Sequence, residues 1–154
     1  MVGDLDDELR ARRHGGSGHR SVPHTADAQV QAWGPTREAC LAEAVLGMIE
    51  CFAEVSGVRP TAVERVRLAP GSDEDLLVGL LDEFVFRLEV TGRIPVDVEV
   101  ETAEEDDGGL DVRSAVAELD QVEIIGAVPK GISWQGLHIG PDPYGWSCTA
   151  IVDV

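Results

Sequence analysis

The stretch SDEDLLVGLLDEFVFRLEVTGRIPVDVEVE, residues 72–101, decides the fold class. Its first part carries leucine, valine and phenylalanine at helical spacing, and Ser72 with Asp75 three positions later is typical of a capping box, here with Asp in place of Glu. Gly92 ends that helix. From Ile94 to Glu101 the even-numbered positions are Ile or Val and are expected to face a core, as in a half-buried strand. A helix followed directly by such a strand indicates a mixed α+β domain.

The same two patterns recur on both sides of this stretch. A second amphipathic helix is predicted after the N-cap Thr36, and its apolar stripe of Leu41, Val45, Met48 and Phe52 ends near Gly57. Further strands are predicted at Ala28–Trp33, at Val63–Ala69, through Leu110 and Val112, at Gly131–Ile139 and at Trp146–Val154. The expected fold is an α+β sandwich in which two helices pack on a largely antiparallel twisted sheet.

The N-terminal residues differ in composition from the rest. Residues 1–21 are polar and lack apolar periodicity, so they are predicted to form a disordered tail. The remaining residues, 22–154, are predicted to form one domain, because no internal repeat or second core is visible.

The charge of the chain excludes several functions. The 154 residues carry 29 acidic and 12 basic side chains, a formal net charge of −17. The first 20 residues hold four acids and four arginines, so the whole excess falls on residues 21–154. Such a surface repels phosphate backbones and anionic leaflets, which argues against direct nucleic-acid binding and against membrane docking.

Location is indicated by what the chain lacks. No apolar stretch approaches the roughly 20 residues that span a bilayer, and the first residues lack a signal-peptide core. The three cysteines, Cys40, Cys51 and Cys148, contain no CxxC motif and are expected to be buried, inert thiols. A soluble protein of the cytoplasm is the expectation.

Two short segments are candidates for chemistry. Catalytic motifs such as GxSxG and the Walker A loop are absent, which argues against an enzyme.

His24-Thr25-Ala26-Asp27 is either a turn that caps a strand or a functional site. If the chain ends at Val154, the Asp153 side chain and the terminal carboxylate lie within one residue of each other and repel unless a cation joins them. Oxygen ligands favour Ca²⁺, Mg²⁺ or Mn²⁺, and the alternative is a frayed, solvated end.

Four segments in order resemble the archease family. The first is His24–Asp27 with the following Ala-Trp-Gly-Pro-Thr, and the second runs from Glu74 to Phe84. The third is the Gly-x-x-x-Lys segment that continues through Lys130 to Leu137, and the fourth is Trp146–Val154. Together they cover residues 24–154, and their order and spacing make the resemblance specific.

The resemblance implies a function. Archeases are accessory proteins of RtcB-type RNA ligases in tRNA splicing or RNA repair, and they promote the metal- and GTP-dependent guanylylation and the turnover of the ligase without ligating RNA themselves. They bind a divalent ion through positions that match Asp27, Asp153 and Val154 here. Ca²⁺ is the expected ion, with Mg²⁺ and Mn²⁺ as alternatives. Asp27 is therefore expected to be a ligand rather than only a turn cap.

Some positions depart from the family pattern. Gln135 stands where the family usually has His and Trp134 where it usually has Tyr, and Gln135 retains hydrogen bonding but not proton transfer. His24, Lys130 and Gln135 are candidate contacts to the ligase, and a salt bridge is an equal alternative for Lys130. The departures keep a second function open, an adaptor or small-molecule-binding domain on the same scaffold. A metal-dependent hydrolase is disfavoured, because the sequence supplies neither a nucleophile nor a base.

Overall fold

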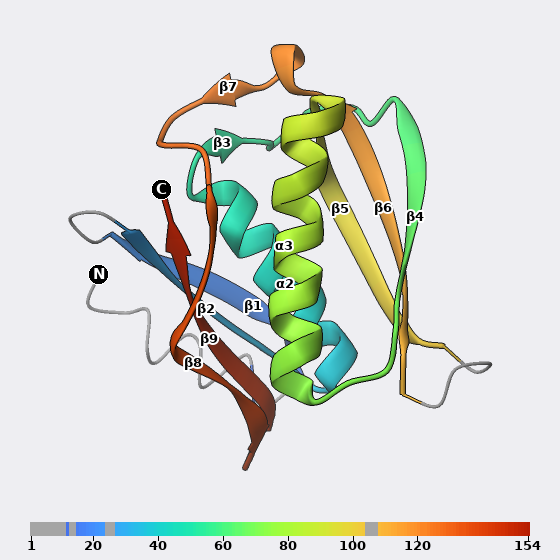
Figure 1. Ribbon diagram of the computed structural model, residues 1–154, viewed down its shortest axis with the longest axis vertical. Coiled ribbons are helices and arrows are strands. Elements are labelled where there is room, and N and C mark those ends of the chain that lie inside the picture. Colours follow the sequence, from blue (N-terminus) through green and yellow to red (C-terminus); the bar gives the residue numbers. More distant parts are fainter. Residues whose placement is uncertain (1–11, 13–14, 24–26, 104–107) are drawn as a thin grey trace.

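The computed structural model describes residues 12, 15–23, 27–103 and 108–154 (Figure 1). The strands are β1 (Gly18–Pro23), β2 (Asp27–Gly34), β3 (Ala53–Glu54), β4 (Ala62–Leu68), β5 (Arg93–Thr102), β6 (Leu110–Glu118), β7 (Glu123–Ile124), β8 (Gly131–Asp142) and β9 (Gly145–Asp153). The helices are α2 (Arg37–Glu50) and α3 (Asp73–Thr91), with a short 3₁₀ turn at Leu119–Gln121.

The strands form antiparallel sheets around the two helices. The order is β1-β2-β9-β8 in a four-stranded sheet and β4-β6-β5 in a three-stranded sheet, and β3 pairs with β7 in a two-residue ladder. Figure 1 shows the helices between the two larger sheets, where α2 lies against β2 and β5 and α3 lies against β8. The predicted α+β class with two helices and antiparallel pairing is confirmed, and the single predicted sheet is divided into separate sheets.

The helix ends follow from the capping residues. Thr36 Oγ1 accepts a hydrogen bond from Ala39 N at 3.1 Å at the start of α2. Ser72 and Asp75 form both bonds of a capping box at the start of α3. Gly92 ends α3 with a φ of 66°, a left-handed conformation that favours glycine. Helix α2 ends at Glu50, earlier than the predicted end near Gly57, because the chain turns there into β3.

The core lies between the helices and the inner faces of the sheets. Its largest fully buried side chains include Phe52, Phe84 and Met48. Cys40 and Cys148 are buried as predicted and Cys51 is half-buried. A hydrogen bond with Cys148, together with burial, raises the pKa of the Cys40 thiol, which keeps that thiol protonated and unreactive.

One buried hydroxyl in the sheet is unusual. Ser114 of β6 is fully buried, and its Oγ has no hydrogen-bond partner among the described residues. A buried hydroxyl without a partner lowers stability relative to an apolar side chain of the same size.

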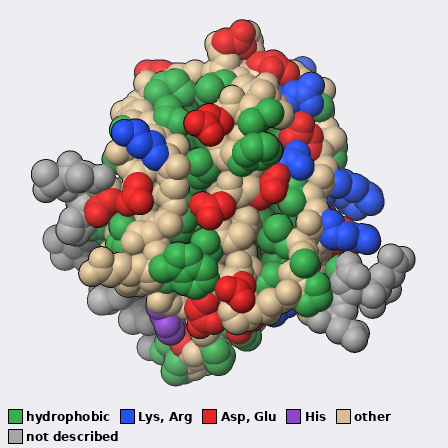
Figure 2. Space-filling model, in the orientation of Figure 1, with side chains coloured by type: hydrophobic (Ala, Val, Ile, Leu, Met, Phe, Trp, Pro, Cys, Tyr) green, Lys and Arg blue, Asp and Glu red, His purple; other side chains and the backbone are tan. Residues whose placement is uncertain are grey.

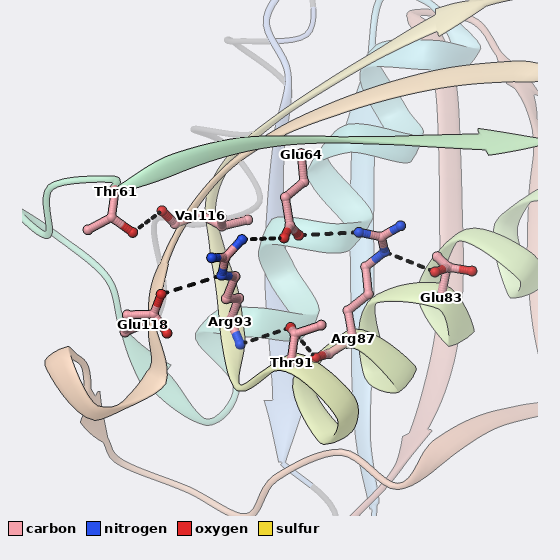
Figure 3. A network of polar contacts seen from close by, with 8 residues as sticks. All are labelled: Thr61, Glu64, Glu83, Arg87, Thr91, Arg93, Val116 and Glu118. Atoms are coloured by element: carbon pink, nitrogen blue, oxygen red, sulfur yellow. Dashed lines mark hydrogen bonds and ion pairs between the residues drawn. The ribbon is translucent and has the colours of Figure 1, made fainter.

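An ion-pair network joins the end of α3 to the three-stranded sheet. Figure 3 shows the Glu64 carboxylate between two guanidinium groups, with Arg87 Nη1 at 3.2 Å and Arg93 Nη1 at 2.9 Å. Arg87 also contacts Glu83 at 2.9 Å, and Arg93 contacts Glu118 at 3.4 Å. The connection depends on Glu64, because its carboxylate contacts both arginines and its side chain is only 16% exposed.

The predicted boundary of the domain at residue 22 is wrong. Gly18–Ser21, placed in the tail by the sequence analysis, belong to strand β1, which pairs with β2. The reason is tertiary: a Cβ at Gly18 would lie 2.7 Å from the Trp33 ring, and Arg20 lies over that ring at 5.4 Å. Residues 1–11, 13 and 14 lie outside the described residues, so the predicted disordered tail stays a prediction for them. In the described part of the chain, no helix is long and apolar enough to cross a membrane.

His19 attaches β1 to α2. Its Nδ1 lies 2.8 Å from a Glu43 oxygen and its Nε2 contacts Glu50, and these two acids sit on either side of Gly47. Burial opposes protonation, but the contacts with Glu43 and Glu50 outweigh it and raise the pKa of His19 above its usual value. Both ring nitrogens can donate only in the imidazolium form, so this attachment is strongest when His19 is charged.

Candidate functional site

The structure brings two predicted metal-binding residues together. Asp27 opens β2 and Asp153 closes β9, and the antiparallel register places them directly opposite each other. Directly opposite residues point to the same face, with Cβ atoms roughly 4.5–5.5 Å apart. Asp153 is exposed, and Asp27 is half-buried with its Oδ1 shielded from solvent. Two carboxylates in this arrangement form a negatively charged end of the four-stranded sheet.

The third strand leaves room beside this pair. Gly131 of β8 lies opposite Asp153 on its other side. A Cβ built on Gly131 would meet no atom within 4 Å among the described residues, so the space next to the Asp153 carboxylate is open. An open position next to paired carboxylates is a feature that an ion-binding site requires.

Lys130 and Val154 lie at the same end. Lys130 N donates to the Asp153 carbonyl at 2.7 Å, and the lysine residue is exposed. Val154 follows Asp153 directly and is half-buried. Within the described residues, no group of three or more His, Cys, Asp or Glu side chains is placed to hold a metal ion. A site here therefore has two carboxylate side chains and needs further oxygen donors, for which Val154 is the nearest candidate in sequence.

Of the two remaining candidates, the structure describes only Gln135. His24 lies outside the described residues, so its predicted role as a contact stays a prediction. Gln135 lies in a bulge of β8, because the four residues Trp134–Leu137 face a single residue of β9 between the Ser133–Ile151 and His138–Thr149 pairs. Gln135 is exposed, and its backbone N–H donates to Ser133 Oγ at 3.1 Å.

The bulge itself was missed by the sequence analysis. Gly131–Ile139 was predicted as one strand, but its middle leaves the ladder at Trp134–Leu137. Gly136 has a φ of 76°, which only glycine adopts easily, so Gln135-Gly136 was the signal in the sequence. Bulges of this kind re-aim side chains, and here Trp134 is 57% exposed.

Comparisons with known proteins agree with the sequence motifs. A family model described as the archease protein family (MTH1598/TM1083) matches residues 19–154. The chain is 40% identical over 138 residues to a probable protein archease of Mycobacterium tuberculosis, an alignment that covers 90% of this chain and 75% of that protein. It is 24% identical over 144 residues to a protein archease of Methanosarcina barkeri, covering 90% of this chain and 97% of that one.

Solved structures show the same fold. The solution structure of protein 1598 from Methanobacterium thermoautotrophicum superposes with a TM-score of 0.67 at 22% identity, covering 89% of this chain and 99% of that one. The crystal structure of a Thermotoga maritima archease, described as a possible chaperone, superposes with a TM-score of 0.62 at 16% identity, covering 86% and 94%. The matched family model and the mycobacterial relative together establish that this chain belongs to the archease family.

Proposed function

We propose that this chain is a metal-binding protein cofactor, not itself an enzyme, that activates an RtcB-type RNA ligase in tRNA splicing or RNA repair in the cytoplasm. The observation that carries the proposal is the placement of Asp27 directly opposite Asp153. Like charges directly opposite on two strands lower stability, and a divalent cation held between the two carboxylates would offset this repulsion. Membership of the archease family supports the ligase as the partner.

In this proposal Asp27, Asp153 and Val154 hold a divalent ion. The donor set is made of oxygens, which favours Ca²⁺, with Mg²⁺ or Mn²⁺ as alternatives. The open space beside Gly131 fits such an ion, and the half-buried position of Asp27 keeps one donor ordered. When bound, the ion supplies positive charge at the sheet end, which neutralises the two carboxylates. Lys130, whose backbone N–H donates to the Asp153 carbonyl, is a basic residue at the same end of the sheet.

The net charge of −17 supports a role through a protein rather than through direct RNA contact. An acidic chain is repelled by RNA, so the ligase makes the contacts with the phosphate backbone. The description of the Thermotoga maritima relative as a possible chaperone is also consistent with a protein partner.

A second candidate is an adaptor or small-molecule-binding domain without ligase activation. The exposed bulge favours it, because Trp134 and Gln135 occupy surface positions at which this chain departs from the family pattern. The two candidates differ in one observation, whether the chain changes the rate of ligase guanylylation.

The test is a titration of the chain into a purified RtcB-type ligase from the same source, with GTP and Mn²⁺, followed by the amount of guanylylated ligase. We expect acceleration at stoichiometric amounts, loss of acceleration with Asp27→Asn and Asp153→Asn, and no loss with Glu101→Gln. Glu101 is a matched control, because it lies directly opposite an acid, Asp111, on the other sheet. No acceleration by the wild-type chain would refute the proposed function.

A further inference from the structure

Exposed apolar side chains are concentrated on one part of the molecule. In the described part of the chain, eight large hydrophobic residues are exposed, and six of them come from α3, from the segment 123–130 that includes β7, and from the β8 bulge. These six, called the apolar face below, are Phe86, Val90, Ile124, Ile125, Val128 and Trp134, and they are between 42% and 63% exposed. Single exposed hydrophobic residues are ordinary, but a concentration of them marks an interaction surface.

The segment that carries three of these residues is held by its backbone. Ile125 N and Gly126 N both donate to Phe52 O, at 2.8 and 3.2 Å, and Lys130 N donates to Asp153 O at 2.7 Å. A Cβ at Gly126 would lie 2.6 Å from Cys51 O, so the backbone approaches the body of the protein closely. From residue 123 to 130 only Pro129 is buried. The segment therefore presents its apolar side chains to solvent from a fixed backbone.

Helix α3 borders this segment. Helix α3 packs against β8, and the Ile132 backbone at the start of β8 lies beside the Asp82 carboxylate. Phe86 and Val90 follow Asp82 at helical spacing, about 6 and 12 Å further along the same stripe. Figure 1 shows the chain between β7 and β8 running down beside α3, and β8 itself packs against α3.

The same surface is acidic between its apolar positions. Asp82, Glu89 and Glu123 are exposed on or beside it, and Lys130 is the one basic residue of the segment. Figure 2 shows carboxylates between the hydrophobic side chains of this view, while most Lys and Arg side chains lie along one edge. A partner for this surface must supply apolar side chains surrounded by Arg and Lys.

We propose that the apolar face is the docking surface for a protein whose matching surface is apolar with a basic rim, and that Trp134 on the β8 bulge is its main anchor. The inference rests on the proposed function, in which that protein is the RtcB-type ligase. A second copy of this chain does not fit, because two acidic surfaces repel each other, and an anionic membrane is excluded for the same reason. The segment ends beside Asp153, so docking here brings the partner next to the carboxylate pair.

The test measures binding of the full chain to the purified ligase by calorimetry, separately from guanylylation. Trp134→Ser and Ile125→Ser are the test variants, and Val63→Ser is the matched control, since Val63 is 65% exposed on β4 of the other sheet. Removal of an aromatic anchor that the partner buries is expected to raise the dissociation constant about 30-fold, whereas the dissociation constant of the control variant should stay within about twofold of that of the wild-type chain. Far-ultraviolet circular dichroism and melting temperature confirm that each variant is folded.

The outcomes separate docking from activation. We expect Trp134→Ser to activate the ligase fully once its concentration exceeds its weakened dissociation constant, and high salt to weaken wild-type binding. If the wild-type chain binds and activates but Trp134→Ser and Ile125→Ser bind as tightly as Val63→Ser, this inference is refuted and the proposed function stands. If the wild-type chain does not bind the ligase at all, both are refuted.

Discussion

Replacing Asp153 by Asn should change the stability of this protein in opposite directions with and without a divalent ion. Without an ion, Asp153 and Asp27 are like charges placed directly opposite each other. Such a pair costs roughly 0.2–1 kcal/mol, and Asn keeps the size of the side chain while removing one charge. In the presence of EDTA the variant should therefore be about 0.5 kcal/mol more stable than the wild-type protein.

With an excess of Ca²⁺ the order should reverse. An ion that binds only the folded state stabilises it by about 2.7 kcal/mol at a concentration 100 times the dissociation constant. Loss of one carboxylate ligand should weaken the site at least tenfold, which removes about 1.4 kcal/mol of that gain at the same concentration. The variant should then be about 0.9 kcal/mol less stable than wild type, a difference of roughly 2–4 °C in melting temperature for a chain of this size.

The assay is urea unfolding followed by circular dichroism, in EDTA and in Ca²⁺, for the wild-type chain, Asp153→Asn and Glu101→Gln. Glu101 also lies directly opposite an acid, Asp111, but Arg67 contacts Asp111 at 3.4 Å and already balances that charge. The stability of Glu101→Gln should therefore respond to Ca²⁺ as the wild-type protein does. Equal responses of Asp153→Asn and wild type to Ca²⁺ would refute the reasoning, because Asp153 would then not be a ligand.

Three further predictions concern the fold. Glu64→Gln removes the charge that Arg87 and Arg93 share and should lower the melting temperature by several degrees, whereas Glu99→Gln at an exposed position should leave it unchanged. Equal melting temperatures of the two variants would show that the Glu64 ion pairs do not stabilise the fold. His19→Gln should cost more stability in urea titrations below pH 6.5 than at pH 9. The folded protein raises the pKa of His19, so the contribution of His19 to stability is complete below its pKa in the unfolded chain and is lost as the pH rises through its pKa in the folded protein. A stability difference that does not change with pH would contradict this. Ser114→Ala should raise the free energy of unfolding by about 1 kcal/mol, because it removes a buried hydroxyl without a partner. Ser72→Ala removes the N-cap of α3 and should lower the free energy of unfolding by about 1 kcal/mol. Changes of the same sign would contradict the roles given to these two serines.

The periodic elements of this fold could be predicted from the sequence. Both helices were predicted with their N-caps, because Thr36 and Ser72 are followed by apolar stripes at helical spacing. The strand that became β5 was also predicted, although a bulge between Pro95 and Asp97 leaves Val96 only half-buried. These features are local, since each depends on residues within one or two turns of the chain.

Strand β1 and the β8 bulge could not be predicted in the same way. Gly18–Pro23 has no apolar alternation, and it is ordered by contacts with Trp33 and with α2 that come from distant parts of the chain. Gly136 was a signal for the bulge, but the extent of the bulge over Trp134–Leu137 depends on how β8 is registered against β9, which the strand pattern alone does not specify.

For the candidate site too, the sequence determined the residue types and the tertiary structure decided how they are arranged. The sequence by itself determined which residue types were available, an acid at position 27 and an acid before the last residue, and the family resemblance connected them. Only the tertiary structure decided that Asp27 and Asp153 face each other across β2 and β9, with the open space at Gly131 beside them. The physical reason is that strand register is set by long-range packing of the sheet on the helices, because a shift of one residue would turn every buried side chain of β9 toward solvent.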